Sequence, residues 1–120
     1  MLSVNATIPG GEWSRRTGIA AITTKPRHAS ILLVRSAARY VNEVALQGAD
    51  VTQARRYVKM AKQYFEMEED MAAMTAARTA IFLARSVLQS GESKELKQKG
   101  DSLMQAADLT LDVLSKTQKG

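Results

Sequence analysis

Apolar side chains recur every three or four positions between residues 26 and 48, which predicts an amphipathic helix. Its apolar face consists of Leu33, Ala37, Tyr40, Val41 and Val44. Pro26 suits the first turn of a helix, with Thr24 as a candidate cap, and Gly48 suits a left-handed stop. Asp50 and Gln53 have the spacing of a capping box, which predicts that a second helix begins there.

The apolar periodicity continues from residue 51 to residue 88 without an intervening proline or glycine. Its near-heptad stripe consists of Tyr57, Met60, Tyr64, Met67, Met71, Met74, Ala77, Ile81, Ala84 and Leu88. One interpretation is a single helix about 55 Å long, at about 1.5 Å per residue. The other is a helical hairpin broken near Glu66–Asp70, with Asp70 as the cap of its second helix, since acidic residues favour a helix N-terminus. We favour the hairpin because it makes a domain of this length compact.

A last helix is predicted from about Ser93 to Ser115. Its apolar stripe consists of Leu96, Gly100, Leu103, Ala107, Leu111 and Leu114. A glycine in a helix interior costs about 1 kcal/mol relative to alanine, so Gly100 requires a reason. Two interpretations are open: Gly100 lets another backbone approach closely, or it ends a short helix and Asp101 caps the next one.

The two ends of the chain differ from these helical regions. In residues 1–25, Pro9-Gly10-Gly11 is a strong turn signal that blocks a continuous helix, so we predict an extended N-terminal arm. Residues 117–120 are polar, and we expect this tail to fray. The predicted fold is therefore all-α, a bundle of about four helices over residues 26–116 that the arm precedes.

The composition restricts the chemistry that this chain offers. It has 120 residues, which suits one domain, no cysteine, and a single histidine, His28. These counts exclude disulfides, thiolate metal sites, cysteine nucleophiles and most catalytic triads. The densest set of carboxylates is Glu66, Glu68, Glu69 and Asp70, which we interpret as a solvated turn because no calcium-loop glycine accompanies it. We therefore expect no enzyme activity, no metal, no cofactor and no small-molecule substrate.

Positive charge gathers in two parts of the chain. The net charge is +5, and the excess lies in the arm and in the second helical region. The candidate phosphate contacts are Arg15, Arg16, Lys25, Arg27, Arg55, Arg56, Lys59 and Lys62. The last four share one helix flank, and Arg35 and Arg39 would extend this patch if the two helices were adjacent. Nucleic-acid binding, alone or within a nucleoprotein assembly, is therefore our alternative hypothesis for the function.

The hypothesis that we favour is a non-catalytic binding or assembly subunit of a larger complex, through self-association or contact with other protein subunits. The arm holds the only tryptophan, which a small bundle does not obviously need, so we expect the arm to dock on a neighbouring surface. A methionine- and alanine-rich helix face would supply a second surface, although a methionine stripe also suits an ordinary core. The predicted interface residues are Ile8, Trp13, Met60, Met67, Met71 and Met74.

The sequence shows no sign of a membrane or secretion segment. No stretch approaches the roughly 18 consecutive apolar residues of a membrane span, and the N-terminus lacks a signal-peptide pattern. We therefore expect the protein to act in the cytoplasm.

Overall fold

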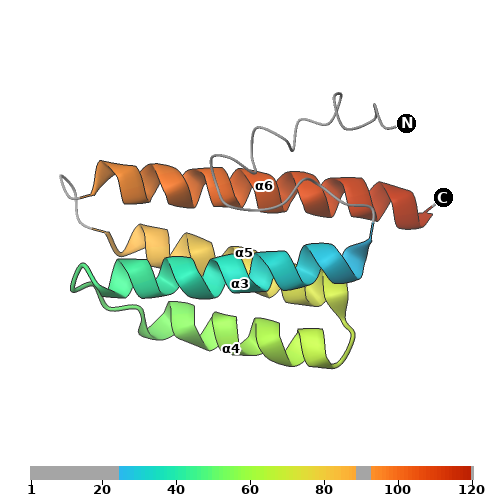
Figure 1. The fold of residues 1–120 in the computed structure, drawn as a ribbon, viewed down its shortest axis with the longest axis horizontal. Helices are drawn as coiled ribbons and strands as arrows, with labels where there is room; N and C mark the ends of the chain where they lie inside the picture. Colours follow the sequence, from blue (N-terminus) through green and yellow to red (C-terminus); the bar gives the residue numbers. More distant parts are fainter. Residues whose placement is uncertain (1–24, 89–92, 120) are drawn as a thin grey trace.

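The computed structural model describes residues 25–88 and 93–119, which contain four α-helices and no strand (Figure 1). The helices are α3 (Pro26–Ala45), α4 (Thr52–Glu66), α5 (Asp70–Ser86) and α6 (Lys94–Lys119). The predicted all-α bundle is confirmed. Residues 1–24 of the predicted arm, Thr24 among them, lie outside the described residues, and Lys25 holds the N-cap position of α3.

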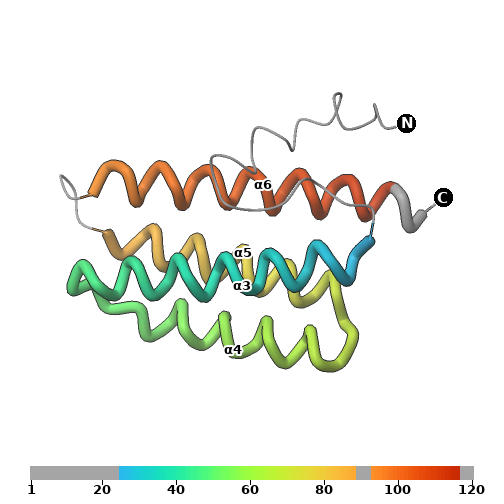
Figure 2. The backbone as a smooth tube through the Cα atoms, in the orientation of Figure 1, coloured from blue at the N-terminus to red at the C-terminus, as the bar shows by residue number. Residues whose placement is uncertain are grey.

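Successive helices run antiparallel (Figure 2). α5 lies against all three other helices, and α3 packs along it, so these two form the middle of the molecule. α6 covers one flank of this pair and α4 covers the other (Figure 1). The extents of 45 × 31 × 17 Å agree with a body about two helices thick.

The ends of α3 follow the local signals in the sequence. The helix begins at Pro26, as predicted, and Gly48 has a φ of +89° in the turn that follows it. Only a residue without a Cβ adopts this left-handed conformation at little cost. The backbone N–H of Thr52, the first residue of α4, donates to Oδ1 of Asp50 over 3.0 Å. Asp50 therefore satisfies one free donor at the start of α4, although Val51 occupies the N-cap position itself.

Residues 51–88 form the hairpin and not the single long helix. α4 ends at Glu66, α5 begins at Asp70, and between them Glu68 has a φ of +62°, which breaks the helical path. The prediction that Asp70 is the N-cap is wrong. Glu69 holds that position, and Asp70 is the first helical residue, with its carboxylate directed at Arg27 of α3.

The core forms where α3, α4 and α6 meet α5. The predicted apolar face of α3 is buried throughout. In α5 the alanines at 73, 77, 80 and 84 are fully buried, and these short side chains allow neighbouring helices to approach closely. The largest fully buried side chains are Tyr40, Met74, Ile81, Leu103 and Leu114.

Gly100 lies inside α6, so the interpretation that it ends a short helix is wrong. A Cβ at this position would overlap Oη of Tyr40 and would lie 2.8 Å from Cζ of Tyr40 and 2.9 Å from Cγ of Arg85. The Tyr40 hydroxyl occupies this space and donates a hydrogen bond of 2.8 Å to the carbonyl oxygen of Leu96. The close approach is therefore made by side chains of α3 and α5, and not by another backbone, which was the other of the two interpretations.

The apolar face of α4 differs from the predicted stripe. Its buried residues are Ala54, Val58 and Ala61, whereas Met60 is 37% exposed and Met67 is 65% exposed. The stripe assumed one register through residues 51–88, but the turn after Glu66 interrupts that register. The smaller apolar side chains of α4 therefore face the bundle, and the larger ones lie at its edge.

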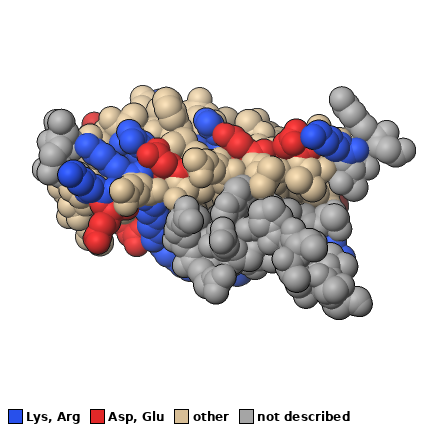
Figure 3. Space-filling view, turned by 90° about the horizontal axis from the view of Figure 1, so that it is seen from above, with Lys and Arg blue, Asp and Glu red and all other residues tan. Residues whose placement is uncertain are grey.

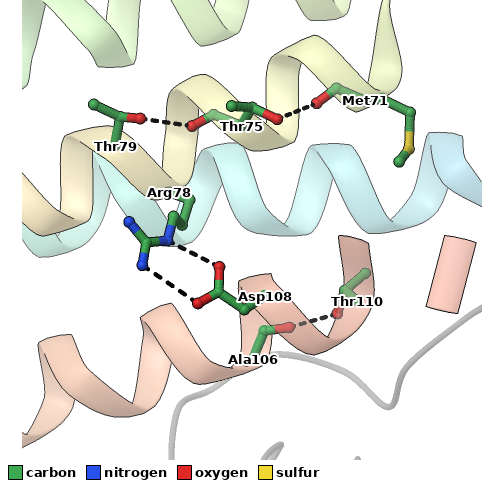
Figure 4. Close-up of polar contacts among 7 residues, drawn as sticks. All are labelled: Met71, Thr75, Arg78, Thr79, Ala106, Asp108 and Thr110. Atoms are coloured by element: carbon green, nitrogen blue, oxygen red, sulfur yellow. Dashed lines mark hydrogen bonds and ion pairs between the residues drawn. The ribbon is translucent and has the colours of Figure 1, made fainter. Parts of the chain in front are cut away.

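Ion pairs join helix to helix on the packed side of the bundle. Arg78 of α5 pairs with Asp108 of α6 at 2.9 Å, as Figure 4 shows. Arg85 pairs in the same way with Asp101 at 2.9 Å. On the face seen in Figure 3, acidic and basic side chains are interspersed. Charges on this side therefore balance one another within the fold.

Candidate binding groove between α3 and α4

α3 and α4 lie side by side, with an open groove between them. One hollow of about 520 Å³ and a second of about 300 Å³ share Ala38, Asn42 and Lys62 in their linings, so they form one continuous depression. We call this the α3–α4 groove. It arises because α4 packs mainly on α5, while its contact with α3 is less extensive.

The floor of the groove is apolar. It consists of Ile31, Val34, Ala38 and Val41 from α3 and of Val58 and Phe65 from α4. The α3 residues flank the buried stripe through Leu33 and Ala37, so they widen the apolar face of that helix toward α4. The predicted apolar face of this helix included Val41 but not Ile31, Val34 or Ala38, because it followed a narrow stripe; a wider apolar arc was the available signal.

Both rims of the groove are basic. Arg35 and Arg39 come from α3, and Arg55, Lys59 and Lys62 come from α4. At one end, Arg55 donates to Oδ1 of Asn42 over 3.1 Å and so links the two helices. The opposite end holds Glu66, the one acidic residue in the lining. The condition that we set for Arg35 and Arg39, that their helix lie next to the basic flank of α4, is met.

Four of the five rim cations have no partner in the described part of the chain. Arg35, Arg39, Lys59 and Lys62 form no side-chain hydrogen bond or ion pair with another described residue. Glu43 stands four residues after Arg39, a spacing that allows a helical ion pair. Its carboxylate turns instead to Nζ of Lys99 on α6, at 2.9 Å.

The other predicted cations do not line the groove. Nη1 of Arg27 donates to Asp70 Oδ1 over 2.6 Å and to the carbonyl oxygen of Phe65 over 2.8 Å, and its guanidinium lies 3.6 Å from the centroid of the Phe65 ring. Arg27 is thus engaged in joining the ends of α3, α4 and α5. Arg56 and Lys25 are exposed elsewhere. Arg15 and Arg16 lie outside the described residues.

The predicted methionine surface is divided between core and surface. Met74 is 0% exposed, Met71 is half-buried, and Met60 and Met67 are exposed. Four side chains in such different environments do not form one contact face. Ile8 and Trp13, the other predicted interface residues, lie outside the described part.

The acidic turn shows no convergence on a metal. Glu66, Glu68 and Glu69 are exposed, and Asp70 is engaged by Arg27 and by the Ser30 hydroxyl, which donates over 3.3 Å. Within the described ranges, no three histidine, aspartate or glutamate side chains are grouped in a way that would hold a metal ion. In the same ranges, no helix has both the length and the apolarity to cross a membrane.

No protein-family model, curated protein or solved structure matches this chain. The function is therefore argued from the geometry and charge of the α3–α4 groove.

Proposed function

We propose that this chain is a non-catalytic binding module, an assembly or adaptor subunit whose working surface is the α3–α4 groove. The observation that carries this proposal is the convergence of four unpartnered cations on the two rims of an apolar depression. Lys94, Lys97 and Arg56 also form no ion pair with a described residue, but they do not line this groove. The groove thus combines the two attractions that a protein-binding site uses, apolar burial and charge complementarity.

The chemistry of the lining favours binding over catalysis. Guanidinium and ammonium groups attract anions, and the aliphatic floor buries apolar surface. In the floor, Val34, Val41 and Val58 are buried and Ile31, Ala38 and Phe65 are half-buried, so the exposed parts of the last three are the apolar surface that a partner would cover. This places the proposed contact on a different surface from the methionine face that the sequence predicted.

Nucleic acid is the second candidate partner. The observation that favours it is the row of five cations along the groove, a suitable arrangement for successive phosphates. The floor favours it less, because a sugar–phosphate backbone has no apolar stripe to cover Ile31, Val34 and Phe65. Binding of this kind would weaken steeply with salt, with a slope of about −0.9 per phosphate contact on duplex DNA.

The test is a titration of the full-length protein, labelled with ¹⁵N, with poly-L-glutamate and separately with a single-stranded oligonucleotide. We expect the amides of Ala38, Asn42 and Lys62 to shift, since these residues belong to both parts of the groove. The double reversal Arg39→Glu with Lys62→Glu is expected to abolish these shifts. Reversal of Lys94 and Lys97 to glutamate changes the net charge equally outside the groove and is expected to leave them intact. Equal effects of the two double variants would contradict the proposal.

A further inference from the structure

Resting on the proposed function, we infer that the α3–α4 groove binds an amphipathic helix of a partner protein, with an apolar stripe that is flanked on both sides by acidic residues. The inference specifies the partner by its chemistry. It depends on the length of the groove, on its floor and on the charge of its two rims.

The length of the groove corresponds to about three helical turns. Along α3 the lining extends from Ile31 to Asn42, which is about 16 Å at about 1.5 Å per residue. Along α4 it extends from Arg55 to Glu66, a similar distance. A docked helix therefore presents three apolar anchors to the floor, at positions i, i+4 and i+7, which is the usual spacing of a helix that binds in a groove.

The rims determine the charge of the partner. Cations stand on both sides of the floor, Arg35 and Arg39 on α3 and Lys59 and Lys62 on α4. A helix lying between them therefore needs acidic side chains on both flanks of its apolar stripe. The flanking charges of coiled coils set partner choice and orientation in the same way. A helix with basic residues beside its apolar stripe would be excluded, because it would bring its cations next to the unpartnered cations of the rims.

The remainder of this chain does not fit the groove as well. Residues 1–24 contain Arg15 and Arg16 against Glu12, so that segment does not complement a basic surface. A second copy offers few free acids from α5 and α6, because their aspartates at 70, 101, 108 and 112 are each paired within their own chain. A separate acidic helix meets neither difficulty.

The experiment uses the full-length protein and three fluorescent probes. The first is an 18-residue helical peptide with a leucine stripe flanked by glutamates, the second is a scramble of the same composition, and the third is a 20-nucleotide single strand. We expect the striped peptide to bind about tenfold more tightly than the scramble, because only the stripe buries the apolar floor. The far-UV circular dichroism of the striped peptide should also show that the peptide gains helix on binding.

Matched variants locate the binding. Arg39→Glu with Lys62→Glu should weaken binding of the striped peptide at least about tenfold, and Lys94→Glu with Lys97→Glu should change it less than about twofold. The chain has no cysteine, so a spin label at Trp13→Cys tests the arm as a competing occupant. Broadening of the Ala38 and Asn42 amides by this label would overturn the inference, and sharp signals would support it.

The remaining outcomes separate this inference from the proposed function. If the scramble binds the groove as tightly as the striped peptide, or the oligonucleotide binds it more tightly, the partner helix is overturned and the binding groove is retained. If the native mass is that of a dimer and the Arg39→Glu/Lys62→Glu variant is a monomer, the occupant of the groove is a second copy of the chain. That result overturns the partner helix and retains the binding groove. If none of the probes gives groove-dependent binding and the native mass is that of a monomer, both the inference and the proposed function fail.

Discussion

The two flanks of the central α3–α5 pair use their charged residues differently. On the α6 flank, Arg78, Arg85 and Lys99 each meet an acidic partner on a neighbouring helix, at 2.9 Å in every case. On the α4 flank, Arg35, Arg39, Lys59 and Lys62 meet none among the described residues. Three cations of the α6 flank therefore join helices, although Lys94 and Lys97 of α6 form no ion pair with a described residue, whereas none of the four rim cations of the groove joins helices.

The same contrast holds for packing. On the α6 flank, Gly100 and the alanines of α5 let the Tyr40 ring lie closely between helices, and no described side chain has a buried polar atom without a partner. On the α4 flank, the α3–α4 groove leaves Ile31 and Ala38 of α3 and Phe65 of α4 half-buried. The α6 flank is thus closely packed at these positions, and the α4 flank carries the groove that we propose as a binding surface. Four changes test this difference.

The largest expected effect is at the closest helix contact. Gly100→Val should lower the free energy of unfolding by about 3 kcal/mol, the upper part of the usual range for overpacking, because the new side chain would overlap Tyr40 and Arg85. Urea denaturation measures it. Gln98→Val, which places the same side chain on the exposed face of α6, is the control and should change stability by about 0.5 kcal/mol. Similar losses in the two variants would show that the α6 flank is not tightly packed.

The second effect concerns the ends of three helices. Asp70→Asn should lower the free energy of unfolding by about 1–2 kcal/mol, because the Asp70 carboxylate is only 18% exposed and holds Arg27 and Ser30. Thermal unfolding followed by circular dichroism measures it. Glu69→Gln removes an exposed carboxylate one residue earlier and should have an effect below about 0.5 kcal/mol.

The third effect depends on pH. Burial raises the pKa of the Tyr40 hydroxyl well above its usual value, so the folded state keeps the phenol protonated. As the pH rises, the phenol ionises in the unfolded chain before it does in the folded state. The stabilisation of the fold by the protonated phenol is therefore complete below pH about 10, and above it the free energy of unfolding falls by about 1 kcal/mol per pH unit. Urea denaturation at pH 9 and at pH 11 should show a smaller decrease for Tyr40→Phe than for the unsubstituted chain.

The smallest effect compares single cations on the two flanks. Arg78→Glu replaces an ion pair with a repulsion against Asp108 and should cost up to about 1 kcal/mol, within the range for exposed pairs. Arg39→Glu removes a cation without a described partner and should leave the free energy of unfolding within about 0.5 kcal/mol. A clear loss for Arg39→Glu in urea denaturation would show that the groove cations stabilise the fold, and the contrast between the flanks would disappear.

The local signals in the sequence were sufficient for most helix boundaries. The hairpin of residues 51–88 was favoured only because it is compact, since the acidic residues after Glu66 left the single long helix open. Pro26 begins α3, and Gly48 adopts the left-handed conformation that follows it. Each of these features depends on neighbours within about one helical turn, and so a single sequence contains it. The assignment of Asp70 as a cap failed because its carboxylate is used by Arg27, 43 residues earlier in the chain.

The sequence by itself determined the helices, their order and the basic flank of α4. Only the tertiary structure decided which apolar residues of α4 face inward, that Glu43 pairs with Lys99 and not with Arg39, and that the cations of residues 35–39 and 55–62 border one groove. The physical reason is that periodicity describes the face of one helix, whereas a groove is a relation between two helices. That relation depends on how tightly each packs on α5, which no local pattern in the chain specifies.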